Sequence, residues 1–161
     1  MSAGTVIEIR TATLADLPAL QVVFERASLS NEGDRDALLA HPEVLVYGDE
    51  WVRRGDARVA TIAGRLVGFA TAVANDTAWE LEDLFVDPDA MRQGIGRALI
   101  GDVVTRARAA NVRRIEVTGN DHALAFYRAV GFERDGDVET TFGSAHRMHL
   151  DVDASVHRSD D

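Results

Sequence analysis

The residues that decide the fold of this chain run from position 81 to position 99. They read Leu81-Glu82-Asp83-Leu84-Phe85-Val86-Asp87-Pro88-Asp89-Ala90-Met91-Arg92-Gln93-Gly94-Ile95-Gly96-Arg97-Ala98-Leu99. A strand-like run that starts at Trp79 ends before the proline, and two glycines then precede apolar residues at helical spacing. This order predicts a strand over 79–86, a short loop, and a helix over 93–110 whose apolar face holds Ile95, Leu99, Val103 and Ala107.

The start of this predicted helix is a candidate anion site. Unpaired backbone N–H groups and the positive end of the helix dipole attract anions there. Gly94 and Gly96 would let a diphosphate lie against the backbone, and Arg92 and Arg97 add positive charge. The alternative is that the glycines only form a tight turn. Two commoner phosphate loops are excluded, because Leu99 stands where a dinucleotide loop has its third glycine and the chain has no lysine for a mononucleotide loop.

The rest of the chain alternates strand and helix patterns around this stretch. Further strands are predicted at 6–10, 57–62, 66–73, 114–118, 132–140 and 147–151. Further helices are predicted at 13–27, in one or two short pieces within 35–54, and at 123–130. The strand-helix-strand order over 79–118 requires parallel pairing, whereas the strands between 57 and 86 follow one another through turns and favour antiparallel pairing. The fold class is therefore α/β (α+β), a central mixed sheet with helices on both faces.

Composition limits the chemistry and the surroundings of the chain. Its 161 residues predict a single domain over 1–152 followed by a disordered tail over 153–161. The absence of cysteine excludes disulfides and thiolate nucleophiles, and the absence of lysine excludes Schiff-base chemistry. The net charge of −10 argues against a nucleic-acid partner. No signal peptide or membrane-length apolar run is present, so a cytoplasmic protein without a membrane partner is predicted. The histidines show no ligand spacing with a partnering acid, so no metal site is predicted.

The ordered set of motifs resembles the GNAT (general-control-related N-acetyltransferase) superfamily. The central motif of that family reads Gln/Arg-x-x-Gly-x-Gly/Ala, and the run from Met91 to Gly96 follows it except at Met91. A second block contains the family's Asn, Ala, Tyr and Gly-Phe at the family's spacing, and it reads Asn120-Asp121-His122-Ala123-Leu124-Ala125-Phe126-Tyr127-Arg128-Ala129-Val130-Gly131-Phe132. The resemblance covers roughly residues 6–152. It implies a GNAT-like acyl-CoA N-acyltransferase fold, acetyl-CoA as co-substrate, and transfer of its acetyl group to a primary amine of a small molecule or protein.

The resemblance also implies roles for particular residues. The pantetheine arm would bond the backbone of Leu84, Phe85 and Val86 like an added strand, and the Leu84 N–H would polarise the thioester carbonyl. Asn120 would bond the pantetheine, and Tyr127 would protonate the departing thiolate. The diphosphate would lie in the loop of Met91 and Arg92, held by the N–H groups of Gln93, Gly94, Ile95, Gly96 and Arg97. Pairing of two copies through the last strands is common in the family, so a homodimer is predicted.

Direct attack requires a neutral amine, and therefore a group or a water relay that takes its proton. Glu80 and Glu82 are two apart on the predicted strand, so their side chains share one face with that of Leu84. Glu82 is the first candidate base and Glu80 the second. The alternatives are that both are ordinary exposed strand residues, or that they bind a cationic acceptor, and that Tyr127 is a core tyrosine.

The function itself has two alternatives. The chain could be a non-catalytic acyl-CoA-binding regulatory domain, or a protein-interaction domain whose glycine loop is only a turn. The acceptor stays open among a polyamine, an aminoglycoside, an amino acid and a protein N-terminus. Residues 28–54 should shape the acceptor site, and they carry the least readable pattern.

Overall fold

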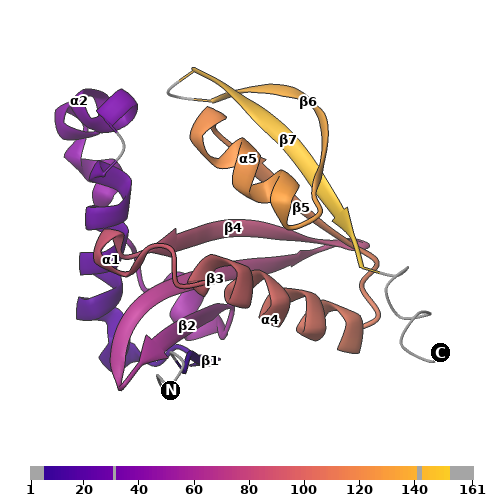
Figure 1. The fold of residues 1–161 in the computed structure, drawn as a ribbon, viewed down its shortest axis with the longest axis horizontal. Coiled ribbons are helices and arrows are strands. Elements are labelled where there is room, and N and C mark those ends of the chain that lie inside the picture. The colour runs from indigo at the N-terminus through magenta and orange to yellow at the C-terminus, as the bar shows by residue number, and fades with distance from the viewer. Residues whose placement is uncertain (1–5, 31, 141–142, 153–161) are drawn as a thin grey trace. The chain divides into compact units, whose positions relative to one another are not determined.

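The computed structural model describes residues 6–30, 32–140 and 143–152 (Figure 1). Its strands are β1 (Glu8–Thr11), β2 (Ala57–Ile62), β3 (Arg65–Asn75), β4 (Ala78–Val86), β5 (Arg114–Gly119), β6 (Glu133–Thr140) and β7 (Gly143–Asp151). Its α-helices are α1 (Leu17–Leu29), α2 (Glu32–Ala40), α3 (Glu50–Arg54), α4 (Ile95–Ala109) and α5 (Asp121–Ala129). Short 3-10 helices occupy Leu14–Asp16, Pro42–Leu45 and Pro88–Ala90. Every strand and helix predicted from the sequence is present, whereas the predicted tail over 153–161 lies outside the described residues.

The strands form a seven-stranded mixed sheet in the order β1-β2-β3-β4-β5-β7-β6. β4 and β5 pair in parallel, from Ala78↔Arg114 to Leu81↔Val117, with α4 as the crossover between them. Antiparallel pairing joins β1 to β2, β2 to β3, β5 to β7 and β6 to β7. The predicted mixed sheet is therefore confirmed. The position of the last strand was not predicted: β7 lies between β5 and β6.

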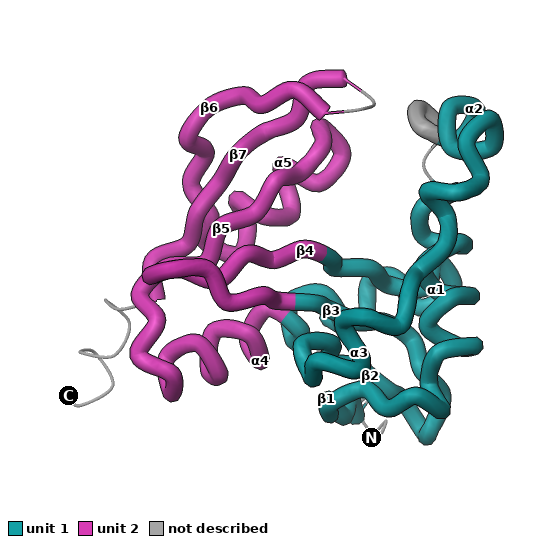
Figure 2. The backbone as a smooth tube through the Cα atoms, turned by 180° about the vertical axis from the view of Figure 1, so that it is seen from behind, with its two compact units in different colours: residues 1–71, 83–99 teal, residues 72–82, 100–161 magenta. Residues whose placement is uncertain are grey.

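The chain groups into two compact units (Figure 2). Unit 1 comprises residues 1–71 and 83–99, and unit 2 comprises residues 72–82 and 100–161. Each unit is thus built from two separate segments, and β3, β4 and α4 each contribute residues to both. The single domain over 1–152 stays a prediction.

The core of unit 1 has helices on both faces of its strands. On one face, Phe24 of α1 contacts Phe85 of β4 edge-on, with ring centroids 5.1 Å apart, and Phe85 lies 5.6 Å from Phe69 of β3. On the other face, a Cβ added to Gly68 would lie 3.0 Å from Ile95 of α4 and 2.9 Å from the carbonyl oxygen of Phe85. Gly68 therefore allows α4 to approach β3 closely, since any larger residue would collide with backbone.

The core of unit 2 forms between α5 and one face of β5 and β7 (Figure 1). Tyr127 of α5 packs against Phe132 with ring centroids 5.2 Å apart, and a Cβ added to Gly119 would meet both Tyr127 and Met148. Ile115 is also fully buried. The opposite face of these strands is polar, and it carries the carboxylates discussed below.

Helix α4 confirms its predicted apolar face. Ile95, Leu99, Val103 and Ala107 are all 2% exposed or less. Among the described helices, none combines the length and the apolar character that crossing a membrane requires.

Candidate active site

The loop between β4 and α4 holds two residues in the left-handed region. Arg92 has φ 67° and Gly94 has φ 81°, and α4 begins directly after them at Ile95. Alternation of left-handed and right-handed residues turns successive N–H groups toward one side and forms an anion-binding nest. At the start of α4 the Ala98 N–H donates to the Gly94 carbonyl at 2.9 Å, and the N–H groups of residues 95–97 precede this donor in the first turn.

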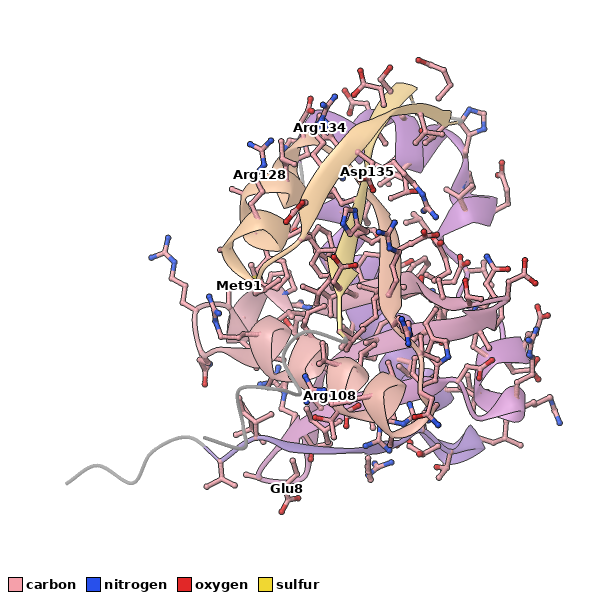
Figure 3. The ribbon with its side chains drawn as sticks, turned by 90° about the vertical axis from the view of Figure 1, so that its right-hand side faces the viewer. Glu8, Met91, Arg108, Arg128, Arg134 and Asp135 are labelled. Atoms are coloured by element: carbon pink, nitrogen blue, oxygen red, sulfur yellow. The ribbon has the colours of Figure 1, made fainter. Side chains whose placement is uncertain are left out.

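Most side chains of this loop face solvent, whereas that of Ile95 is buried and anchors the end of the loop in the core. Met91, at 57% exposure, lies in the segment before α4 (Figure 3), and Arg92 and Arg97 are exposed as well. Ile95, by contrast, is 2% exposed. The exposed backbone of the loop can therefore meet a ligand without rearrangement of the core, and the absence of Gln or Arg at Met91 removes a side chain but no N–H group.

A buried aspartate fixes the start of the loop. Asp87 is 4% exposed, and its Oδ1 accepts hydrogen bonds from the Asp89 N–H at 2.9 Å and from Arg26 at 3.2 and 3.3 Å. Its Oδ2 lies 3.4 Å from Arg65, and its N–H donates to the Val67 carbonyl at 2.8 Å. These bonds join the loop to α1 and β3, all within unit 1. The sequence did not predict this network, although the Asp-Pro pair at a strand end is a typical start of a short helix.

The second motif block, from Asn120 to Phe132, folds in unit 2 around α5. The Asn120 side chain is the N-cap of α5, and its Oδ1 accepts a hydrogen bond from the Ala123 N–H at 3.0 Å. Tyr127 is 6% exposed and packs with its ring against Phe132, Phe126 and the bare backbone of Gly119. Both residues thus have structural roles, and the roles in cofactor chemistry implied for them stay predictions.

The two candidate bases differ in their surroundings. Arg147 of β7 donates to both carboxylate oxygens of Glu80, each at 2.7 Å, and it also bonds Glu116 at 2.9 Å and Thr118 at 3.0 Å. Glu82 is exposed. Partial desolvation and the negative charge of Glu80 raise the pKa of Glu82 above its ordinary value, while Arg147 opposes this rise. Glu80 is therefore tied into an ion pair, and the pKa of Glu82 is shifted in the direction that favours a base near neutral pH.

Three of the described histidines have acidic partners, which the prediction from spacing did not include. His41 Nδ1 lies 3.4 Å from Glu43, two residues along the chain. His146 Nε2 lies 2.6 Å from Asp121, and its Nδ1 accepts a bond from Arg134 at 2.9 Å. His149 Nδ1 lies 2.8 Å from Asp135, and Arg134 and Asp135 both come from β6 (Figure 3). Asp121 and Asp135 lie 25 and 14 residues away from their histidines, so local spacing does not reveal these two pairs. Within residues 6–140 and 143–152, as far as they are described, no three His, Asp or Glu side chains are placed to hold a metal ion.

The segment that was hard to read from the sequence is held by α1. Gln21 donates to the Leu45 carbonyl at 2.6 Å and accepts from the Tyr47 N–H at 2.8 Å. The Tyr47 hydroxyl lies 3.1 Å from Thr71 Oγ1, and burial raises the pKa of Tyr47 to about 12. Tyr47 is therefore neutral at physiological pH and belongs to the core of unit 1.

Comparison with curated proteins finds acetyltransferases. Serotonin N-acetyltransferase 2, chloroplastic, of Oryza sativa subsp. japonica is 31% identical over 135 residues, which are 80% of this chain and 62% of the rice protein. The N-alpha-acetyltransferase RimI of Mycobacterium tuberculosis is 38% identical over 81 residues, which are 48% of this chain and 51% of that protein. This chain thus spans less than two thirds of the length of either relative.

Comparison with solved structures finds the same fold. The PaiA N-acetyltransferase of Thermoplasma acidophilum, determined in complex with coenzyme A, matches with a TM-score of 0.73 at 18% identity, over 91% of this chain and 99% of that one. At this identity the likeness establishes the architecture. The family described as "Acetyltransferase (GNAT) family" matches residues 25–132. Because that match spans well over half of the chain, this protein belongs to the GNAT family of acetyltransferases.

Proposed function

We propose that this protein transfers an acetyl group from acetyl-CoA to a primary amine by direct attack of the amine on the thioester. The observation that carries the proposal is the loop before α4, where Arg92 and Gly94 adopt left-handed conformations and the N–H groups of the first helical turn follow. Such a nest at a helix start suits a diphosphate. Membership of the GNAT family supports the same conclusion.

The remaining binding groups follow from the strand beside this loop. The parallel pairing of β4 with β5 runs from Ala78↔Arg114 to Leu81↔Val117, and β4 continues to Val86. In the proposal, the backbone of Leu84, Phe85 and Val86 bonds the pantetheine arm in the manner of an added strand. The N–H groups from Gln93 to Arg97 bind the diphosphate, and Asn120 adds a bond to the pantetheine.

Three residues would carry the reaction. Glu82, directly or through water, takes a proton from the ammonium form of the acceptor, which leaves a neutral amine. The amine nitrogen bonds to the acetyl carbon, the bond between that carbon and sulfur breaks, and the Leu84 N–H stabilises the negative charge on the carbonyl oxygen. Tyr127 gives its hydroxyl proton to the departing thiolate. The proton that the amine still carries after attack is released to solvent.

The acceptor we propose is a primary amine on a small molecule or at a protein N-terminus. The two curated relatives are named for acceptors of these two kinds, serotonin and an N-alpha amine. The cytoplasmic location and the homodimer predicted from the sequence stay predictions, and sedimentation of the purified protein would check the latter.

A panel of amines tests the proposed function. Polyamines, aminoglycosides, amino acids and peptides with free N-termini are each incubated with acetyl-CoA, and released thiol and acetylated amine are both measured. The expected result is thiol release that depends on the amine and matches the amount of acetylated product. Binding of CoA without turnover on any amine would favour a regulatory acyl-CoA-binding domain, and failure to bind CoA would favour a protein-interaction domain.

The loop before α4 gives a direct prediction for CoA binding. Gly94→Val is expected to weaken CoA affinity about tenfold or more, because a side chain in the left-handed region costs about 1–2 kcal/mol and the loop will leave the nest conformation to avoid that strain. Calorimetric titration with CoA measures the change. Gly101→Ala is the matched control, since Gly101 lies within α4, has nothing within 4 Å of an added Cβ, and gains helix propensity as alanine. Equal affinity in the two variants would remove the loop from the site.

A further inference from the structure

The polar face of unit 2 is organised around one guanidinium. Register partners in a sheet share a face, and the pairs Glu80↔Glu116, Glu116↔His149 and Thr118↔Arg147 place these residues on one surface of three adjacent strands, β4, β5 and β7 (Figure 1). From β7, Arg147 reaches across β5 to β4 and bonds all three of its partners in unit 2. Its side chain is 32% exposed, and those of Glu80 and Glu116 are 20% and 29% exposed.

The bond to Glu80 is a bidentate pair. The two terminal guanidinium nitrogens each donate to a different carboxylate oxygen at 2.7 Å, a geometry that fixes orientation as well as charge. Both oxygens of Glu80 therefore already accept hydrogen bonds from Arg147, and Glu80 can bond an incoming amine fully only when Arg147 releases it.

Glu82 lies two residues after Glu80 on the same strand, and the bidentate pair with Arg147 involves Glu80 and not Glu82. We propose that Arg147 is a positioning residue: by holding Glu80 in an ion pair, it makes Glu82 the carboxylate that takes the proton from the acceptor amine. This inference rests on the proposed function. It assigns a role to a residue more than 60 positions away from β4, on the last strand of the sheet.

Charge balance makes the proposal specific. The charged groups on this face include Glu80 and Glu82 on β4, Arg114 and Glu116 on β5, and Arg147, His149 and Asp151 on β7. From β6, Glu133 pairs with His149 and Asp135 bonds it at 2.8 Å. Of these, Glu80 raises the pKa of Glu82 and Arg147 lowers it, after the larger effect of partial desolvation. Removal of Glu80 should therefore lower the pKa of Glu82, and removal of Arg147 should raise it. When both are removed, the two shifts should nearly cancel.

The test is the pH dependence of kcat/KM in a charge cycle. In Arg147→Gln the low-pH limb should move to higher pH by about half a pH unit or more, because a positive charge near Glu82 is lost and the negative charge of Glu80 is left uncompensated. In Glu80→Gln the limb should move to lower pH, because the positive charge of Arg147 is then uncompensated. In the Arg147→Gln/Glu80→Gln double variant the limb should return close to its position in the wild type. In Arg147→Lys, which keeps the positive charge, the limb should also stay close to its wild-type position.

The matched control is Arg114→Gln. Arg114 lies on the same face and its substitution removes the same charge, but Arg114 forms ion pairs with Glu116 at 4.0 Å and Asp151 at 3.5 Å, so the limb should stay in place. A limb that does not move in Arg147→Gln, or moves in the same direction in both single variants, would overturn the proposal. So would an equal shift in the Arg114 control.

A second measurement separates this inference from the proposed function. The Glu82 carboxyl can be titrated by NMR in the same variants, without any turnover. Opposite shifts of its pKa in a protein that acetylates no amine would overturn the proposed function and leave the electrostatic role of Arg147 standing. Turnover with a normal low-pH limb but no pKa change at Glu82 would retain the acetyltransferase and overturn the role of Arg147.

Discussion

Tyr127→Phe is expected to lower the rate of the chemical step about 10²–10⁴-fold while the affinity for acetyl-CoA changes little. The substitution removes a proton donor and keeps the ring. That ring is 6% exposed and packs against Phe132, Phe126 and Gly119, so the core of unit 2 should persist. Single-turnover release of thiol measures the step, and calorimetry measures the affinity.

The only other tyrosine of the sequence provides the control. Tyr47 is also buried, and its hydroxyl bonds Thr71 in the core of unit 1. Tyr47→Phe should lower the free energy of unfolding by about 1 kcal/mol, from the lost hydrogen bond, without a comparable loss in the chemical step. If Tyr127→Phe were to leave the chemical step unchanged, water or another group would have to protonate the thiolate.

Glu82→Gln is expected to lower turnover by a similar factor, about 10²–10⁴-fold, and to abolish the low-pH limb of the rate profile. A base works only in its deprotonated form, so activity falls as the pH drops through the pKa of that base. Because the pKa of Glu82 is raised in the folded protein, the limb should lie above the value of about 4.3 typical of a free glutamate. Glutamine keeps the shape of the side chain and removes its basicity.

The same profile separates catalysis from binding. If Glu82 only attracts a cationic acceptor, the variant should show a higher KM for the amine and keep its low-pH limb. A Glu80→Gln/Glu82→Gln double variant with the kinetics of the wild type would exclude both carboxylates from the mechanism.

Local patterns were enough to predict the elements of this fold. The run from 57 to 62 and the apolar face of α4 were found where the alternation and the 3.6-residue period placed them. The ends of strands were less accurate: β7 begins at Gly143 rather than at residue 147, because its pairing with β6 decides where it starts. The position of β7 between β5 and β6 has no local signal, since strand order depends on the whole sheet.

The candidate site also has features that a local sequence pattern predicts and features that depend on distant parts of the chain. Its loop was predictable because a strand end, a proline and two glycines are consecutive in the sequence. The left-handed conformation of Arg92 was not, because non-glycine residues rarely adopt it. Arg26, which bonds Asp87, and Arg147, which bonds Glu80, lie 61 and 67 residues away from them, so no local pattern distinguishes the surroundings of Glu80 from those of Glu82. That distinction arises from tertiary contacts alone.

The place of β7 also determines how this chain can fold while it is being synthesised. β6 is made before β7, yet among the described strands β7 is its neighbour, and the side of β5 that receives β7 stays open until the same moment. An unpaired strand edge is a template for pairing with other chains. The nascent polypeptide therefore carries two such edges between the completion of β6 and the emergence of β7. A chain that ends before β7 therefore leaves both edges unpaired, and we expect it to aggregate.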